Sequence, residues 1–556
     1  MDFGLTTSYF QALSKYSFVA HLGENGSYLT DLMLFNTQSQ AKTPLLDILW
    51  QSANEDRAPF YAPGHKRGKG ISPKLADYFG AAVFRADLPE LPQLDNLFAP
   101  QGAIQAAEEL AAAAFGAEKT WFLVNGSTCG VEAAILATCG VGEKIILPRN
   151  VHYSAIAGLI LSGAIPVFVY PEYDPVLDIA HSITPQGVAA ALAQHPDAKA
   201  VMMVYPTYYG VCGDVEAIAS LAHQHNIPLI VDEAHGPHFA FHPELPTPAL
   251  AAGADLTVQS IHKVLGAMTQ ASMLHVQGNR VNSDRISKSL QLLQSTSPSY
   301  LLLASLDAAR QQMALHGKEL MAKTLQLADE ARNRISQISG LSVLQIPPST
   351  PVALDRTRLT VTVSQLGLTG FEADEILHQE LGVTAELPSL QHLTFIITFG
   401  NTQADIERLI QAFVTLAQRF GQGDRATRGQ GDKGTRGQGG QGGQGDNYQL
   451  PITRYPLPIT NYQSKIQNPK SKIGSPLSPR EAFFAPTERL PIQQTCDRIS
   501  AELVCPYPPG IPVLMPGEVI TPEAIEDLKR IQAMGGFITG CADSSLGSLK
   551  VVNQKR

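Results

Sequence analysis

Short runs of apolar residues alternate with Ala-rich amphipathic segments from about residue 43 to residue 276. Apolar runs of four to six residues between helices are typical of a parallel sheet buried on both faces. The pattern therefore predicts an α/β fold with a mainly parallel sheet covered by helices, in a large domain at residues 43–284. The apolar runs lie at residues 121–124, 144–147, 165–170, 200–204, 228–231 and 256–258, and the clearest helices at 104–115, 131–138 and 215–223.

The alternation changes after residue 284. Helical spacing dominates residues 285–338, and a smaller α+β pattern follows up to residue 420. We therefore expect a helical connection and a small α+β domain over residues 285–420. Its predicted elements are a strand at 359–363, a helix at 370–380, a strand at 393–398 and a helix at 403–420.

Two segments lack the spacing of helices or strands. Residues 1–42 have neither a clear period nor strong helix caps, so they are expected to form a poorly ordered extension. Residues 421–480 repeat Thr-Arg-Gly-Gln-Gly after eight residues and a Tyr-x-Leu-Pro-Ile-Thr segment after seven. Because such glycine- and proline-rich repeats cannot bury a core, we expect a disordered insertion there. Globular patterning then predicts a C-terminal domain at residues 481–556.

Composition sharpens this picture mainly through charge. The whole chain has a net charge of −9, but residues 421–480 hold nine Lys or Arg and three Asp or Glu. The remaining residues therefore hold 32 basic and 47 acidic side chains, a net charge of −15. An acidic body argues against nucleic-acid binding, because it has no basic face to neutralise phosphates. It is compatible with a small cationic substrate.

The cysteines and the apolar stretches indicate where the protein acts. The six cysteines form no C-x-x-C pair and have no histidine cluster beside them, which predicts reduced thiols in a cytoplasmic protein and no metal site. The N-terminus carries Asp2 and no basic region, unlike a secretory signal. The longest apolar stretch, residues 151–170, contains His152, Tyr153 and Pro166, so no membrane span is expected.

Polar residues follow three of the predicted strands, at the edge where α/β sheets bind ligands. Ser127 and Thr128 follow the first at a glycine turn that opens a helix. Backbone N–H groups and hydroxyls at such a place can hold a phosphate, although Ser and Thr also cap helices for structural reasons alone. Asp232 and His235 follow the second. That aspartate can bind a metal, orient a base, stabilise a protonated heterocycle or simply cap a turn.

The third strand end carries Ser260, His262 and Lys263 in the order Ser-x-His-Lys. A lysine beside a buried strand must lose its charge or find a partner, unless it lies in an exposed loop. A phosphate cradle, then a strand-end aspartate, then Ser-x-His-Lys 31 residues later is the order found in the aminotransferase type of pyridoxal 5′-phosphate enzyme. It predicts that Lys263 binds the cofactor covalently and that Asp232 keeps the pyridine nitrogen protonated.

Further residues fit the same site. His152, which follows another strand, is expected to stack on the cofactor ring, although an ordinary core or surface histidine is the alternative. His235 is a candidate cofactor contact, and Ser260 and His262 are expected to add to the phosphate cradle beside Ser127 and Thr128.

The chain resembles the bacterial ornithine/lysine/arginine decarboxylases, a family of pyridoxal-phosphate enzymes with the aminotransferase fold. The block 504–518, which plain aminotransferases lack, is the most specific of the matching stretches. The segment before Thr43 is too short for the N-terminal wing domain of the large members, so the likeness is to wing-less members. The other matching stretches are residues 59–66, 91–97, 115–117, 122–127, 149–152, 205–210, 232–235 and 260–263.

This resemblance implies decarboxylation of a basic L-amino acid in polyamine metabolism by a cytoplasmic homodimer. Arginine, giving agmatine, is the expected substrate, with lysine second and ornithine third. Two other classes of function stay open. One is a different pyridoxal-phosphate reaction on this fold, such as transamination or aldol cleavage, and the other is a non-catalytic α/β binding protein.

Overall fold

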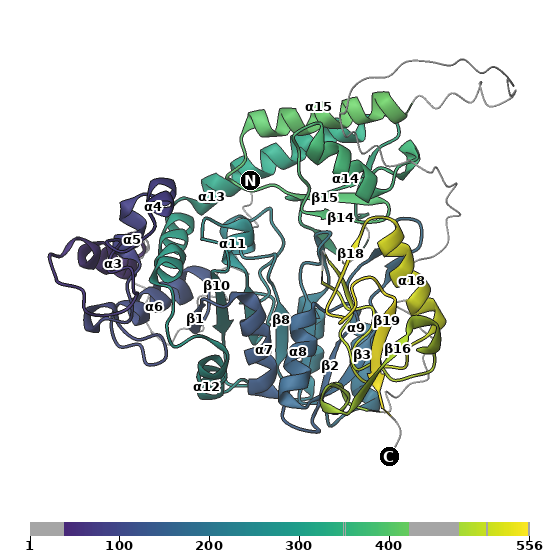
Figure 1. The fold of residues 1–556 in the computed structure, drawn as a ribbon, viewed down its shortest axis with the longest axis horizontal. Coiled ribbons are helices and arrows are strands. Elements are labelled where there is room, and N and C mark those ends of the chain that lie inside the picture. Colours follow the sequence, from purple (N-terminus) through teal and green to yellow (C-terminus); the bar gives the residue numbers. More distant parts are fainter. Residues whose placement is uncertain (1–37, 348–349, 351, 422–476, 508–509, 554–556) are drawn as a thin grey trace, which may run out of the picture.

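The computed structural model describes residues 38–347, 350, 352–421, 477–507 and 510–553 (Figure 1). Residues 1–37 of the predicted extension lie outside the described residues. So do residues 422–476 of the predicted insertion. Within the described residues, no helix is both long enough and apolar enough to cross a bilayer.

A seven-stranded sheet forms the centre of the large unit, in the order β1-β10-β9-β8-β6-β2-β3. The strands β9, β8, β6, β2 and β3 pair in parallel, whereas β10 pairs antiparallel with both of its neighbours. The interior residues Ile145, Ile146 and Leu147 are fully buried, as a sheet covered on both faces requires. The strands are β1 Lys119–Leu123, β2 Lys144–Pro148, β3 Ile165–Val169, β6 Ala200–Val204, β8 Leu229–Asp232, β9 Leu256–Gln259 and β10 Ser272–Val276.

Helices cover both faces of this sheet, and the two faces have separate cores. One core joins the sheet to α7 Gly126–Thr138, α8 Tyr153–Ser162 and α12 Ser283–Leu293. The other core involves α3 Pro44–Asn54, α6 Ala103–Phe115, α9 Pro185–Gln194, α10 Val215–Gln224 and the first half of α13 Tyr300–Ser336. Shorter elements of the unit are α4 Pro73–Phe79, α5 Ala81–Ala86, α11 Ile261–Val264, β4 Tyr173–Asp174, β5 Ile179–Ala180 and β7 Val211–Cys212.

A smaller α+β unit follows, built on an antiparallel sheet in the order β11-β13-β15-β14. The second half of α13 packs on this sheet through Leu327, Ala331 and Ile335, so one helix belongs to both units. Strand β12 Ala353–Leu354 pairs with β7 and ties the two units together. The other elements are β11 Ser342–Val343, β13 Arg358–Thr362, α14 Gly370–Gln379, β14 Leu387–Pro388, β15 His392–Ile396 and α15 Gln403–Phe420.

The C-terminal residues form a compact unit beside α8 (yellow in Figure 1). Its own core contains Leu528, Ile520 and Val551, all fully buried, while Met515 packs into the core of the large unit. Ser478 caps the first helix of this unit, α17, a few residues before the predicted start of the C-terminal domain at residue 481. The elements are α17 Pro479–Phe484, β16 Thr487–Pro491, β17 Cys505–Tyr507, α18 Pro522–Ala533, β18 Phe537–Thr539 and β19 Ser548–Val552.

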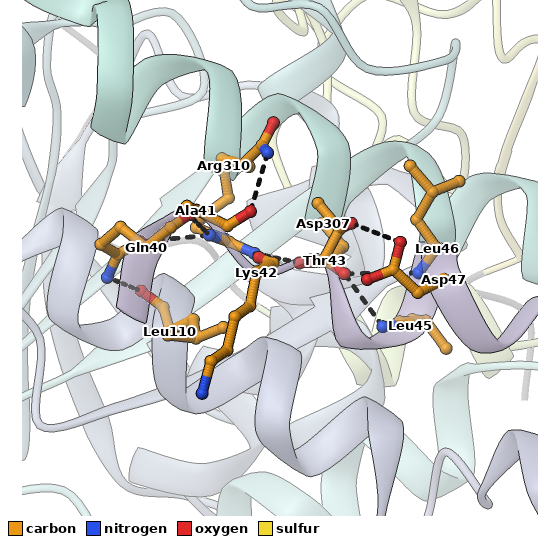
Figure 2. A network of polar contacts seen from close by, with 11 residues as sticks. Gln40, Ala41, Lys42, Thr43, Leu45, Leu46, Asp47, Leu110, Asp307 and Arg310 are labelled. Atoms are coloured by element: carbon orange, nitrogen blue, oxygen red, sulfur yellow. Dashed lines mark hydrogen bonds and ion pairs between the residues drawn. The ribbon is translucent and has the colours of Figure 1, made fainter. Parts of the chain in front are cut away.

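A buried polar network fixes the start of α3 against α13 (Figure 2). The carboxylate of Asp307 accepts hydrogen bonds from the N–H groups of Leu45 and Leu46, at 3.0 and 3.4 Å. These N–H groups have no partner inside their own helix, so Asp307 caps α3 from a distant part of the chain. Arg310 pairs with Asp307 and donates to the Gln40 carbonyl at 2.6 Å. Specific contacts thus begin a few residues before Thr43.

The predicted strands match the observed elements of the large sheet closely, but three features differ. The predicted helical stretch 285–338 is two helices, α12 and α13, because Pro298 lies between them and cannot donate a helical hydrogen bond. The apolar stretch 151–170 divides into α8 and β3. Strand β10 runs antiparallel to its neighbours and was not predicted. The predicted fold class, a mainly parallel sheet covered by helices, is confirmed.

Candidate active site

One pocket lies where the carboxyl ends of β2, β6 and β8 meet the small unit and the C-terminal unit. Parallel strands point the same way, so the residues that follow them gather at one edge of the sheet. The pocket brings together five of the predicted site residues: Ser127, His152, Asp232, His235 and Lys263. The predicted residues Thr128, Ser260 and His262 lie beside the pocket and are not among those that line it.

Lys263 lies on the short helix α11, directly after the buried strand β9. Burial is the main cause that lowers the pKa of its amine to about 8, with Arg358 lowering it further and Asp232 raising it. Its Nζ lies 3.0 Å from Nε2 of His235. An amine that is partly uncharged near neutral pH is a competent nucleophile, which agrees with the predicted covalent role.

Asp232 ends strand β8 and is 6% exposed. Its carboxylate accepts a hydrogen bond from the N–H of Ala234 at 3.2 Å, and burial raises its pKa. No ion pair of Asp232 occurs among the residues that the structure describes. Burying a carboxylate is costly unless cations offset it, and the charge of Lys263 offsets the burial of Asp232 only in part, so this group is suited to a further cationic atom in the pocket.

His152 caps helix α8, and its Nδ1 lies 2.9 Å from the hydroxyl of Ser154. Burial, with help from the charge of Lys263, lowers its pKa to about 3. The imidazole is therefore neutral at physiological pH, which suits stacking on a ring. Gly510 of the C-terminal unit accepts a hydrogen bond from the N–H of Tyr153 at 3.0 Å, so the neighbouring backbone is held in place.

The candidate phosphate cradle is built from two strand ends. Gly126 has φ +76°, a conformation that glycine adopts without strain, and it opens the 13-residue helix α7. Ser127 follows, and its hydroxyl accepts a hydrogen bond from the hydroxyl of Ser260 at 2.7 Å. His262 lies on α11, and burial lowers its pKa to about 4. Thr128 lies in the first turn of α7.

Residues that the sequence interpretation did not assign to the site also shape the pocket. Arg149, 4% exposed, binds both carboxylate oxygens of Glu518 and the carbonyls of Pro512 and Val513. The C-terminal block 504–518 thereby becomes a wall of the pocket, with Ile511, Pro512 and Val513 lining it. Two sequence signals were available: Arg149 follows the predicted strand at 144–147, and both Arg149 and this block lie in stretches that resemble the decarboxylase family.

Comparison with known proteins identifies the family. The model "Orn/Lys/Arg decarboxylase, major domain" matches residues 43–358, and "Orn/Lys/Arg decarboxylase, C-terminal domain" matches residues 467–541. The chain belongs to the Orn/Lys/Arg decarboxylase family. An arginine decarboxylase of Bacillus subtilis is 37% identical over 93% of this chain and 99% of its own. One of Bacillus anthracis is 38% identical over 93% of this chain and 98% of its own.

A solved structure agrees in fold. The lysine decarboxylase of Francisella novicida superimposes with a TM-score of 0.74 over 96% of this chain and 84% of that chain, at 20% identity. This likeness supports the fold alone. Membership of the family makes the chain an amino-acid decarboxylase, as the sequence predicted, and favours decarboxylation over transamination on the same fold.

The Orn/Lys/Arg decarboxylase family implies pyridoxal phosphate, and the residues of the pocket fit that group. Lys263 supplies an amine of lowered pKa, and the buried carboxylate of Asp232 suits a protonated ring nitrogen. The start of α7 offers backbone N–H groups and the Ser127 hydroxyl for a phosphate. Among the described residues, no group of three or more His, Cys, Asp or Glu could hold a metal ion.

Proposed function

We propose that this chain decarboxylates L-arginine to agmatine and carbon dioxide, with lysine the second choice of substrate and ornithine the third. One observation carries the choice of arginine: proteins named arginine decarboxylase match the chain at 37–38% identity along 93% of its length. The product amine would enter polyamine metabolism. The chain would act in the cytoplasm, in keeping with its six unpaired cysteines.

Seven of the eight predicted site residues have a specific task in this proposal, and His235 is proposed as a further cofactor contact. Bound pyridoxal phosphate supplies the electron sink that makes loss of the carboxyl group from Cα feasible. Lys263 would hold it covalently, and Asp232 would keep a proton on its ring nitrogen. His152 would pack on the ring face, and Ser127, Thr128, Ser260 and His262 would bind the phosphate. The apolar side chains of Ile511 and Val513 would exclude water from the reacting carbon.

The pocket wall also carries a carboxylate suited to a cationic side chain. Asp178 lines the pocket, is 7% exposed and accepts a hydrogen bond from the hydroxyl of Tyr173. A carboxylate accepts N–H donors at about four positions, which makes this type of group suited to a guanidinium or an ammonium group. This supports a basic amino acid as the substrate and does not choose between arginine and lysine.

We further propose that the chain forms a homodimer with its active sites at the subunit interface. The region between α3 and α5 exposes several large apolar side chains, of which Trp50 is 71%, Phe60 94% and Tyr78 83% exposed. Tyr78 packs edge-on against Phe79, which is itself 54% exposed, and exposed apolar groups of this kind suit an interface between subunits. Sedimentation velocity on the wild type and on Phe60→Glu tests this: the dimer is expected for the first and its weakening for the second. A monomeric wild type would contradict it.

A decarboxylation assay with the three basic amino acids tests the reaction and the substrate together. Purified enzyme with pyridoxal phosphate is incubated with arginine, lysine or ornithine, and carbon dioxide, amine and keto acid are quantified. We expect one agmatine per carbon dioxide from arginine, at a higher kcat/KM than for the other two. Faster turnover of lysine would overturn the choice of substrate. Keto acid without carbon dioxide would overturn the reaction.

A further inference from the structure

Arg358, the first residue of β13, lies directly behind the pocket. It is 1% exposed, and its Nη2 donates a hydrogen bond to Nδ1 of His235. Within the described structure its Nε and Nη1 atoms are buried and have no hydrogen-bond partner. A buried guanidinium with two unsatisfied nitrogens is expensive to keep for packing alone. Its hydrogen bond to His235 therefore points to a role beyond packing.

The contact determines where the hydrogen of the imidazole lies. A guanidinium has only N–H donors, so Nδ1 of His235 must be the acceptor. Burial first, and then the charges of Lys263 and Arg358, hold the pKa of His235 well below its ordinary value, so the ring is neutral. A neutral ring that accepts at Nδ1 carries its hydrogen on Nε2. That Nε2 lies 3.0 Å from Nζ of Lys263.

The surrounding backbone is shaped to keep Arg358 in this position. Gly210 has φ +86°, and a Cβ atom there would lie 2.7 Å from Cβ of Arg358. The carbonyl of Gly210 accepts a hydrogen bond from the N–H of Asp355 at 2.8 Å, which holds the chain just before Arg358. The ring of Tyr208 lies 4.6 Å from the ring of His235, inclined at 59°. The imidazole is thus confined between Tyr208 and Arg358.

We propose that Arg358 is a positioning residue for the decarboxylase: by donating to Nδ1 it fixes His235 as the Nε2–H tautomer and directs that hydrogen toward the nitrogen of Lys263. An Nε2–H donor needs a lone pair opposite it, so the arrangement favours the uncharged amine. This role rests on the proposed attachment of the cofactor to Lys263. The charges of Asp232 and Glu386 also act on Lys263, whose own charge acts on His152 and His262, and the centre of the Tyr208 ring lies 5.7 Å from its Nζ.

Nitrogen NMR of the holoenzyme with ¹⁵N-labelled histidine rings tests the tautomer directly. His235→Gln assigns the signal. We expect the wild type to show a protonated Nε2 and a bare Nδ1 between pH 6 and pH 9. A protonated Nδ1, or a doubly protonated ring, would overturn the proposal. Because the tautomer is read in the unaltered protein, the result does not depend on whether the Arg358 variants fold.

Variants then assign the effect to Arg358. Arg358→Met is expected to lose the single tautomer, and Arg358→Lys, which keeps a cationic donor, to retain it. Arg332→Met is the matched control, because Arg332 donates to the carbonyls of Arg358 and Leu344 and, within the described part of the chain, makes no hydrogen bond to His235. An unchanged spectrum in Arg358→Met, or an equal change in Arg332→Met, would show a merely structural role.

A second readout separates this proposal from the proposed function. The pH midpoint of the cofactor absorbance should rise by about one unit in Arg358→Met, because a cation near Lys263 is lost, and stay near the wild-type value in Arg358→Lys. No shift in Arg358→Met would overturn the link to Lys263. If Lys263→Ala leaves the absorbance unchanged, the attachment to Lys263 fails instead, whatever the tautomer of His235.

Discussion

At the scale of single residues, burial determines which groups of the pocket carry charge. The imidazoles of His152 and His262, with pKa values lowered to about 3 and about 4, are neutral at physiological pH. Lys263, with its pKa lowered to about 8, is divided between its charged and uncharged forms. The pocket thus combines neutral rings, a reactive amine and the carboxylate of Asp232, which is what a cationic heterocycle requires.

This predicts the pH dependence of the amine. An unperturbed lysine loses its proton near pH 10.4, whereas Lys263 should lose it near pH 8, so its uncharged fraction should rise steeply between pH 7 and pH 9. Competitive acylation of the apoenzyme, with peptide mapping of Lys263 and N-acetyl-lysine amide as an added reference, measures this. In Asp232→Asn the midpoint should fall, because Asp232 raises the pKa. A midpoint near that of the reference compound would contradict the account.

The sequence predicted those site residues that follow apolar runs. Asp232 and Lys263 come directly after strands, and strand ends in such sheets converge, so their proximity could be inferred without coordinates. Arg149 also follows a strand, β2, but the residues it contacts could not be inferred in this way, and Arg358 begins a strand instead. The carboxylate that binds Arg149 is Glu518, 369 residues along the chain, and Arg358 reaches His235 over 123 residues. Only the tertiary structure shows that these arginines are buried and what they contact.

At the scale of elements, α13 joins the large unit to the small unit, because it packs into the cores of both. Its first half supplies the distant cap of α3, and its second half packs under the sheet of the small unit. Elements with clear periodicity and end signals, such as α15 with its Thr402 capping box, could be predicted from the sequence. Helix α8 could not, because its exposed positions, such as Leu161, are apolar like its buried ones, so its apolar residues show little helical spacing.

The cap from Asp307 predicts a large loss of stability when it is removed. Asp307→Ala leaves the fully buried Arg310 without its carboxylate and two N–H groups of α3 without an acceptor, so the free energy of unfolding should fall by about 3–5 kcal/mol. Denaturant unfolding measures this. Asp329→Ala on the same helix removes a part-exposed ion pair with Arg356 and should cost less than about 1 kcal/mol. Equal losses would contradict the buried cap.

The contact between Arg149 and the C-terminal unit predicts a loss of activity. Arg149→Met removes four hydrogen bonds that hold Glu518, Pro512 and Val513 at the pocket, so kcat/KM should fall at least about tenfold. Arg480→Met is the matched control. Arg480 also joins this unit to the large one, through the carbonyls of Ile160 and Leu161 at 2.8 Å, but it does not line the pocket. Comparable losses in both variants would mean that Arg149 only helps to hold the C-terminal unit against the large unit and does not shape the pocket.

At the scale of the whole molecule, the pocket is assembled from three units, and the sequence between two of them is unlike the rest. Residues 422–476 are rich in glycine and hold eight of the nine Lys or Arg residues of the segment 421–480. Replacing them by a Gly/Ser-rich linker of the same length should change kcat/KM less than about twofold and leave the melting temperature within a few degrees. A large loss of either would show that these repeats contribute to folding or assembly.

The central claim is that this pocket holds pyridoxal phosphate on Lys263. Borohydride reduction of the wild-type holoenzyme, followed by proteolysis and mass spectrometry of the peptides, tests it most directly. The account predicts one reduced pyridoxyl group per chain, on Lys263, and loss of the cofactor absorbance band on reduction. A pyridoxyl group on any other lysine, or none at all in an enzyme that decarboxylates arginine, would contradict it.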